Sequence, residues 1–419
     1  MKVFTFKPFL YGGDKMEKIM LVPTGTEQFS CIGADCEDHC CGSWNIVIDK
    51  TSFMKVTTSS NSTLKPIAKK AYARNTDSKS NGDYGRMKLD KDKQCYFLDE
   101  NKWCLVHKEL GEKALCNTCA IYPREHKEIG DYIEKSLTLS CPETVRVLLL
   151  QQEGLSFEEV MPQSNERIVS KGTLQGEDVD SMWQVRMFAI SLLQERGITL
   201  DLRLMLLGVF VEQLMLKDLT PDNVKQAVEA MQLRLSNGDY LNAMNELKGN
   251  ELVQLTLNKE LLRTTVEELS HSVRYVKVVN QFILGLQTGP LEQETISETT
   301  LFNYLQAQRI YNAFTREHGY ILENYMVHYI FTQVFPYNAK TPLAAYEDIV
   351  LNSQLIKALL VGIAADKGEI TVADAVLVIQ SYTRAVHHNA KSYSVLRQKI
   401  EASQMDTLAY LFAYIKTNE

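Results

Sequence analysis

Residues 31–44 read CIGADCEDHCCGSW and bring together four cysteines, Cys31, Cys36, Cys40 and Cys41. Glycine and small polar residues separate the thiols, so the backbone can fold around a single centre. The adjacent Cys40 and Cys41 cannot easily direct both thiolates at one small tetrahedral ion, whereas a larger cluster or two neighbouring metals can use both. The stretch therefore predicts an N-terminal region that folds around bound metal.

The remaining five cysteines also lie in the first third of the chain, and residues 142–419 contain none. They are Cys95, Cys104, Cys116, Cys119 and Cys141. Cys116 and Cys119 form a C-x-x-C pair, which is a strong local chelating geometry. Nine thiols exceed the needs of one four-thiolate site, and zinc and iron–sulfur clusters both accept four thiolates. The alternative is that the cysteines are reduced and pack as small hydrophobic residues.

The composition is that of a globular protein, and its charge does not favour binding to nucleic acid. The chain has 419 residues, which suggests two or three domains. Hydrophobic residues make up 45% and charged residues 23%, as in ordinary soluble domains. The net charge of -7 provides no basic excess to attract phosphates.

The sequence predicts a cytoplasmic location. Residues 1–20 have no sustained apolar segment and no small-residue cleavage site, so no signal peptide is expected. The apolar stretches 204–216 and 355–365 are interrupted by Glu212 and Lys357, and they are too short to span a bilayer. Because cytoplasmic thiols stay reduced, this location favours a metal site over a disulfide framework.

The hydrophobic pattern divides the chain into two regions. Residues 1–150 contain short elements, with strands or extended pieces expected at 44–49, 94–98 and 132–139. Residues 151–419 carry apolar side chains at helical spacing. The expected helices there are 177–195, 200–217, 221–235, 259–286, 298–317, 322–335, 344–365, 371–387 and 392–417. We therefore expect a mainly α protein in which a small cysteine-rich, metal-binding α+β region packs on a C-terminal multi-helix bundle.

Sequence motifs for common cofactor sites are absent. The C-x3-C-x2-C motif of radical S-adenosylmethionine enzymes would begin at Cys36 and Cys40, but its third position is Ser43. No G-x-G-x-x-G follows a predicted strand, and the chain has neither a P-loop nor H-E-x-x-H.

Three segments resemble the flagellin lysine N-methylase family. They read CIGADCEDHCCGSWNIVIDK from residue 31, CYFLDENKWCLVHKELGEKALCNTCAIYPRE from residue 95 and SLTLSCPETVRVLLL from residue 136. The stretch YILENYMVHYIFTQVFP, from residue 320, is similar to the helical half of that family. The cysteine-rich part is also similar to a wider group of zinc- or iron-chelating cysteine-cluster domains.

The resemblance implies an S-adenosylmethionine-dependent methyltransferase that modifies the ε-amino groups of flagellin lysines. It also implies a [4Fe-4S] cluster held by the cysteine motifs, to which all nine cysteines correspond by position. Peripheral membrane association and homo-oligomerisation are both compatible with the resemblance. The alternatives are a structural zinc in place of the cluster, or a metal-binding scaffold without catalysis.

Several polar residues near the cysteines are candidates for the chemistry. Arg124 could contact the methionine carboxylate of the cofactor, because a guanidinium pairs well with a carboxylate, and a surface ion pair is its alternative. Tyr122 could act as a base or stacking partner, with core packing as the alternative. Glu125 is a further candidate, whereas Glu37 and Asp38 are interpreted as a solvated loop face.

Overall fold

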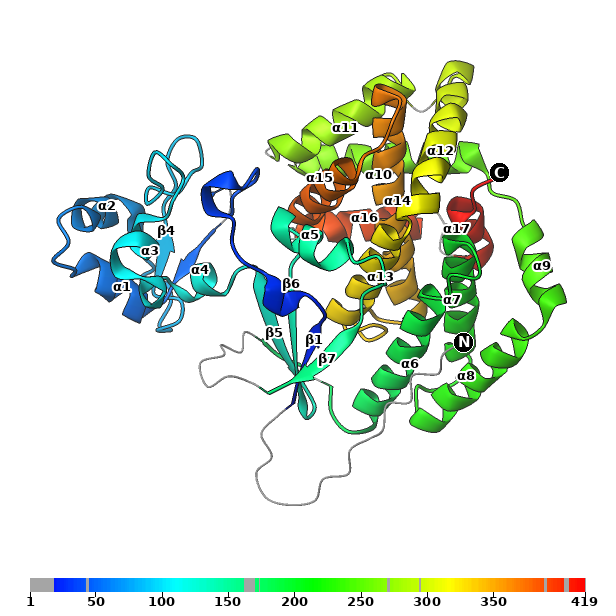
Figure 1. The fold of residues 1–419 in the computed structure, drawn as a ribbon, viewed down its shortest axis with the longest axis horizontal. Helices are drawn as coiled ribbons and strands as arrows, with labels where there is room; N and C mark the ends of the chain where they lie inside the picture. The colour runs from blue at the N-terminus through cyan, green and yellow to red at the C-terminus, as the bar shows by residue number, and fades with distance from the viewer. Residues whose placement is uncertain are drawn as a thin grey trace.

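The computed structural model describes residues 19–42, 45–161, 170–172, 174–269, 272–293, 295–387, 390–402 and 407–418. Helices dominate, and a small α+β region containing most of the cysteines lies at one end of the molecule, on the left of Figure 1. A mixed sheet stands between this region and the helices on the right. The predicted fold class, mainly α with a small N-terminal α+β region, is confirmed.

The N-terminal α+β region has its own small sheet and its own apolar core. Its antiparallel sheet has the strand order β2-β4-β3, with β2 at Val47–Ile48, β3 at Tyr72–Arg74 and β4 at Gly85–Met87. The surrounding helices are α1 (Lys50–Thr57), α2 (Leu64–Ala71), α3 (Leu105–Leu110) and α4 (Asn117–Ile121). The buried core includes Ile48 and Phe97 together with two cysteines, Cys95 and Cys116. The thiols therefore form part of the core that holds this region together.

A second sheet has five strands in the order β7-β1-β6-β5-β8. They are β1 (Ile19–Pro23), β5 (Arg124–Ile129), β6 (Tyr132–Leu137), β7 (Phe157–Val160) and β8 (Ser170–Lys171). β5 and β6 form a hairpin whose turn uses Gly130 at φ +56°, a backbone conformation that glycine adopts without strain. The sheet takes strands from both sides of residue 150, because β7 pairs with β1 and β8 pairs with β5.

The helical body follows the second sheet. Its helices are α5 (Pro142–Leu149), α6 (Glu177–Leu193), α7 (Leu200–Leu214), α8 (Pro221–Leu235), α9 (Gly238–Glu246), α10 (Glu251–Leu269), α11 (Val273–Leu286), α12 (Glu298–His318), α13 (Tyr320–Thr332), α14 (Pro342–Lys367), α15 (Val372–Tyr382), α16 (Ala390–Ala402) and α17 (Leu408–Ile415). The π-helix η4 (Thr383–His387) continues α15. The buried core of this body extends from Phe29 to Ile415 and includes Leu137 on β6. One apolar core thus joins part of the second sheet to the helices.

Helix α14 is the central helix of the body and packs closely against α11. A Cβ atom at Gly362 would lie 2.5 Å from the Cα of Phe282, and one at Gly285 would lie 2.7 Å from the Gly362 carbonyl oxygen. Small residues at these two positions let the backbones approach. By length and composition, α14 is the one described helix that could cross a membrane, but 94% of its apolar window is buried inside the protein. Helix α14 is thus longer than the apolar stretch 355–365, which by itself is too short to span a bilayer.

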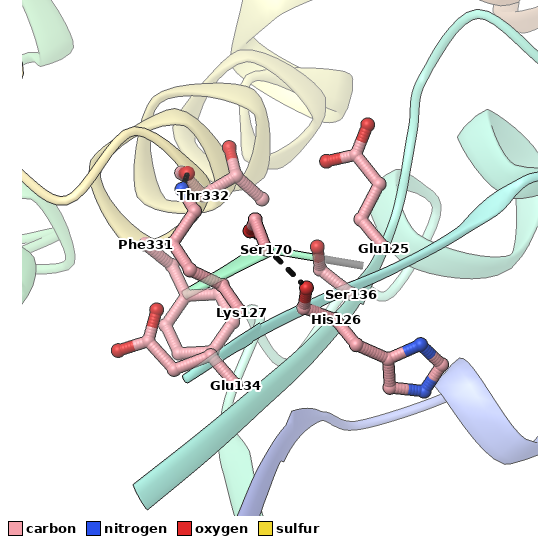
Figure 2. Close-up of a pocket in the computed structure, with 8 residues that line it drawn as sticks. All are labelled: Glu125, His126, Lys127, Glu134, Ser136, Ser170, Phe331 and Thr332. Carbon is pink, nitrogen blue, oxygen red and sulfur yellow. Dashed lines mark hydrogen bonds between the residues drawn. The ribbon is translucent and has the colours of Figure 1, made fainter. Parts of the chain in front are cut away.

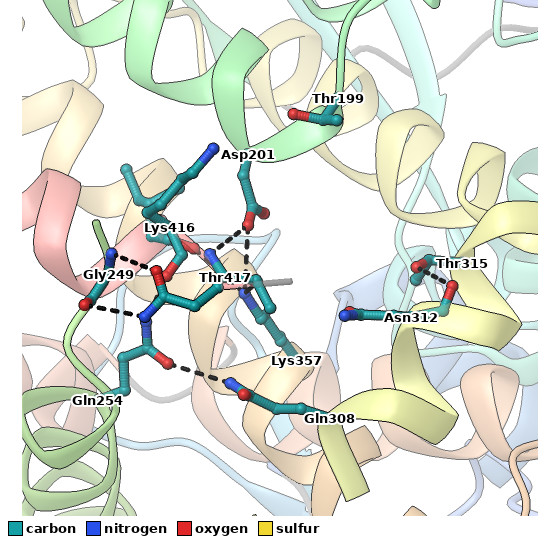
Figure 3. A network of polar contacts seen from close by, with 12 residues as sticks. Thr199, Asp201, Gly249, Gln254, Gln308, Asn312, Thr315, Lys357, Lys416 and Thr417 are labelled. Carbon is teal, nitrogen blue, oxygen red and sulfur yellow. Dashed lines mark hydrogen bonds and ion pairs between the residues drawn. The ribbon is translucent and has the colours of Figure 1, made fainter. Parts of the chain in front are cut away.

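The charge that interrupts this helix has a structural role, shown in Figure 3. Lys357 is 4% exposed and donates to the Ile415 carbonyl oxygen at 3.2 Å and to the Thr417 hydroxyl at 2.5 Å. Its Nζ also lies 3.6 Å from a carboxylate oxygen of Asp201, which accepts from the Thr417 amide at 2.8 Å. The buried ammonium therefore fixes the C-terminal segment against α7 and α14.

Several predicted elements differ from those observed. The predicted helix 259–286 is two helices, α10 and α11, and the predicted helix 392–417 is α16 and α17. The sequence does not predict α9, because Asn237 and Gly238 suggest a turn; the Asn237 side chain instead caps the helix by accepting from two amides. Residues 94–98 form no strand and make only isolated bridges.

Candidate functional site

The nine cysteines are all free thiols, and five of them gather in the core of the N-terminal region. These five are Cys41, Cys95, Cys104, Cys116 and Cys119. They lie close enough to interact electrostatically, and their shared burial is the main reason why the pKa values of Cys95 and Cys104 are raised.

The other four thiols lie where the cysteine-rich region meets the helical body. Cys141 precedes α5 and interacts electrostatically with Cys36 and Cys40, and Cys36 in turn interacts with Cys31. Cys40 also interacts with Cys104, so it connects this group to the thiols of the core. The nine cysteines therefore form two neighbouring groups that meet at Cys40 and Cys41.

Within these groups, the thiols approach one another in pairs. A side-chain hydrogen bond joins Cys40 to Cys41; it lowers the pKa of Cys40 to about 7 and raises that of Cys41. A second such bond joins Cys116 to Cys119; it lowers the pKa of Cys116 and raises that of Cys119. Thiolate sulfur atoms are donors that suit a soft metal. As placed, however, no three His, Cys, Asp or Glu side chains in the described part of the chain form a group that could hold one ion.

The loop that carries the first cysteine motif is held against the helical body by Arg384 of η4. The guanidinium forms an ion pair with Asp38 at 2.7 Å and donates to the carbonyl oxygens of Asp38, His39 and Gly42 at 3.1 to 3.2 Å. Gln380 donates to the Asp38 carboxylate at 2.7 Å and to the Ser140 carbonyl oxygen at 2.9 Å. Asp38 and three loop carbonyls are thus fixed by two side chains more than 300 positions away.

The acidic pair in this loop is only partly a solvated face, because Glu37 is exposed whereas Asp38 is half-buried. Besides the contacts of Asp38, Glu37 forms an ion pair with Arg146 of α5, and Arg274 of α11 donates to its carbonyl oxygen at 3.4 Å. The interpretation of Asp38 as part of a solvated face was wrong, because its partners Gln380 and Arg384 lie on helices that are distant along the chain. Glu37 is exposed, as that interpretation expected, although it also pairs with Arg146. No local motif marks Arg384 or Arg274 as such partners.

The two residues proposed as cofactor contacts point to different surroundings. The Tyr122 hydroxyl lies 3.0 Å from the Ser140 hydroxyl, and burial raises the pKa of Tyr122, with Cys141 and Cys40 close enough to contribute. Arg124 places its guanidinium 5.3 Å from the centre of the Phe29 ring. Tyr122 thus lies beside the thiols at the boundary with the helical body, whereas Arg124 packs on an aromatic ring.

A pocket of about 160 Å³ lies on one face of the β5–β6 hairpin (Figure 2). Two residues of β5, Glu125 and Lys127, contribute to it from alternate positions, and the ring of His126 points away from them. The C-terminal end of α13 and β8 complete it. His126 is also among the lining residues, and the remaining ones are Glu134, Ser136, Ser170, Phe331 and Thr332.

A buried ion pair that includes the lining residue Glu134 lies beside this pocket. Arg186 of α6 contacts both carboxylate oxygens of Glu134, at 2.5 and 3.1 Å, and the two side chains are 1% and 4% exposed. Arg186 also donates to the Phe331 carbonyl oxygen. Lys127 donates to the Thr332 carbonyl oxygen at 2.8 Å, and desolvation lowers its pKa although Glu134 and Glu125 oppose the shift.

Comparisons with known proteins agree with the resemblance seen in the sequence. The FliB lysine N-methylase C-terminal domain matches residues 186–414. A lysine-N-methylase of Salmonella typhimurium is 24% identical over 396 residues, which cover 90% of this chain and 94% of that protein, and one of Salmonella choleraesuis matches to the same extent. A flagellar biosynthetic protein FliU of Salmonella muenchen is 36% identical over 138 residues, or 33% of this chain and 80% of that protein.

No solved structure matches the chain. The match to the two lysine-N-methylases includes nearly all of both proteins, so it covers the cysteine-rich region, the second sheet and the helical body together. The matched domain alone accounts for more than half of the sequence. These similarities support a lysine methyltransferase, and they show that the chain belongs to the FliB lysine N-methylase family.

Proposed function

We propose that the protein transfers methyl groups from S-adenosylmethionine to lysine side chains of flagellin, and that it does so in the cytoplasm. The observation that carries the proposal is the similarity to lysine-N-methylases over 90% of the chain. The flagellar name of the relative from Salmonella muenchen supports flagellin as the protein substrate.

The reaction sets clear demands on the site. A lysine amine has a reference pKa of about 10.4, so it must lose a proton before its nitrogen can attack a methyl sulfonium. The nitrogen, the methyl carbon and the sulfur must also lie in line, which a protein achieves by fixing both partners. The site must therefore offer a proton acceptor and an anchor for the methyl donor. Arg124 and Tyr122, close to the thiols in sequence, remain our proposed contacts to the donor.

We further propose that the cysteines bind an iron–sulfur cluster of the [4Fe-4S] type. Nine free thiols in two adjoining groups support this assignment by their chemistry. Because the thiols meet in pairs rather than in a formed coordination sphere, we assign no step of the methyl transfer to the cluster. When bound, the cluster would supply either a structural anchor for the Cys31–Cys41 loop or an electron.

Anaerobic purification followed by metal analysis and a flagellin assay tests the proposal. We expect iron and acid-labile sulfide, visible absorption that bleaches in air, and transfer of labelled methyl groups to flagellin lysines detected by mass spectrometry. Arg124→Ala should weaken donor binding while the metal stays bound. A colourless protein with stoichiometric zinc would support the structural-zinc alternative, and metal binding without any methyl transfer would support the scaffold.

A further inference from the structure

The pocket on the β5–β6 hairpin has a chemical character suited to a primary amine. Its walls combine a carboxylate, Glu125, with an ammonium, Lys127, and the apolar ring of Phe331. The register of the hairpin pairs Glu125 with Ser136 and Lys127 with Glu134, so these four side chains share one face of the sheet. Figure 2 shows Glu125 and Ser136 on the side of the hairpin that faces Ser170 and Thr332.

Three of the four charged groups at this pocket already have close partners. Arg186 and Glu134 form the buried ion pair, and Lys127 donates to the Thr332 carbonyl oxygen. Glu125 differs from them. Within the described ranges no ion pair is formed by its carboxylate, and the residue as a whole keeps exposed surface although its carboxylate is partly desolvated in the pocket. Glu125 is therefore the carboxylate that remains available to an incoming ligand.

The size of the pocket limits that ligand to a single side chain. A cavity of roughly 150 Å³ accommodates one benzene molecule, whereas drug-sized ligands need about 300 Å³ or more. The volume here is about 160 Å³. The pocket is thus of the right size for a lysine side chain, with its methylenes along Phe331, and too small for a whole nucleoside.

We propose that this pocket receives the acceptor lysine side chain of the substrate protein and that Glu125 takes the proton from its ammonium group. The inference rests on the proposed function and names the acceptor site for it, without the Arg124 contact, because Arg124 lies on the opposite face of β5. The proton moves from the ammonium nitrogen to a Glu125 carboxylate oxygen, which leaves a neutral amine. The amine nitrogen then forms a bond to the methyl carbon as the bond from that carbon to the sulfonium sulfur breaks. The sulfur keeps the bonding electrons and leaves as a neutral thioether.

The surrounding charges favour this proton transfer. Only about one lysine amine in 2,500 is neutral at pH 7 in water. Lys127, which lines the pocket, and Arg186, which pairs with the lining residue Glu134, disfavour a third cation beside them. Partial loss of water raises the pKa of Glu125 although Lys127 opposes that shift. Glu134 is the other charged group that faces the pocket, and Arg186 holds it. An amine in the pocket is therefore deprotonated more readily than in solution.

A binding experiment tests the pocket without relying on catalysis. The full-length protein is titrated with n-butylamine at pH 7, and binding is followed by calorimetry. Glu125→Gln should weaken binding at least tenfold, whereas Lys127→Met should strengthen it because a like charge is removed. Glu158→Gln, at an exposed position on β7, is the matched control and should bind as the wild type does. Absence of binding to the wild type, or equal affinity of the Glu125→Gln and Glu158→Gln variants, would overturn the amine site.

The flagellin assay then tests the role of Glu125 as base. Glu125→Gln should lower kcat/KM at pH 7 by about 100- to 10,000-fold, and the deficit should shrink as the pH rises towards about 10. Circular dichroism of each variant confirms that it folds. A Glu125→Gln enzyme with the wild-type rate and pH profile would refute the assignment. If wild-type protein binds n-butylamine through Glu125 but never methylates flagellin, the proposed function fails and the amine site stands.

Discussion

The buried ion pair between Arg186 and Glu134 provides a quantitative test of the structure. The perturbation is Glu134→Gln, which keeps the shape of the side chain and removes its charge. Arg186 is fully buried and Glu134 is 4% exposed, so the guanidinium would lose its bidentate carboxylate partner far from water. Removing one member of such a pair costs about 3–5 kcal/mol. That is a large share of the typical stability of a folded protein.

The expected loss can be measured by urea unfolding. Trp183 is a suitable probe, because the Arg186 guanidinium lies 5.1 Å from the centre of its ring. With a dependence on urea of about 3 kcal/mol per molar, a loss of 3–5 kcal/mol lowers the unfolding midpoint by about 1–1.7 M. Glu158→Gln, on an exposed strand position, should leave the midpoint unchanged.

A double variant separates the charge from the packing. Replacing Glu134 by Leu and Arg186 by Met removes both charges and should recover more than half of the loss, since the remaining side chains are apolar and of similar volume. If Glu134→Gln alone lowers the free energy of unfolding by less than about 1 kcal/mol, the guanidinium is not held in a dry interior and the reasoning fails.

Three further predictions concern the junction and the core. Arg384→Ala should free the first cysteine loop from the helical body, and faster amide hydrogen exchange around Cys40 than in the wild type would show it; equal exchange would contradict the role of Arg384. Cys40→Ala combined with Cys41→Ala should strip the metal, and a variant that keeps its full metal content would identify both as ordinary buried thiols. Burial lowers the pKa of His328 to about 4, so the unfolded state binds the extra proton between pH 6.5 and 4 and stability falls by about 3 kcal/mol as the pH drops through that window. His328→Gln should remove this part of the slope in urea unfolding measured across the same pH series, and an unchanged slope would refute it.

The sequence by itself determined the class of the fold and the region in which the thiols gather. Helical spacing of apolar residues predicted α8 at its observed bounds, and most of the other long helices to within a few residues. The confinement of the cysteines to the first third of the chain marked the thiol-rich region. These features are local, since they depend on residues three or four positions apart or on short motifs.

The tertiary structure decided how the site is assembled. The expected helix 371–387 gave no sign that Arg384 would hold the first cysteine loop, because that contact joins residues at opposite ends of the chain. Glu125 was one of several polar candidates near the cysteines until the hairpin register placed it opposite Ser136, on the same face of the sheet as Lys127 and near the end of α13. Pairings of this kind depend on how separate elements pack, and a period or a motif in one segment carries no record of its distant partner.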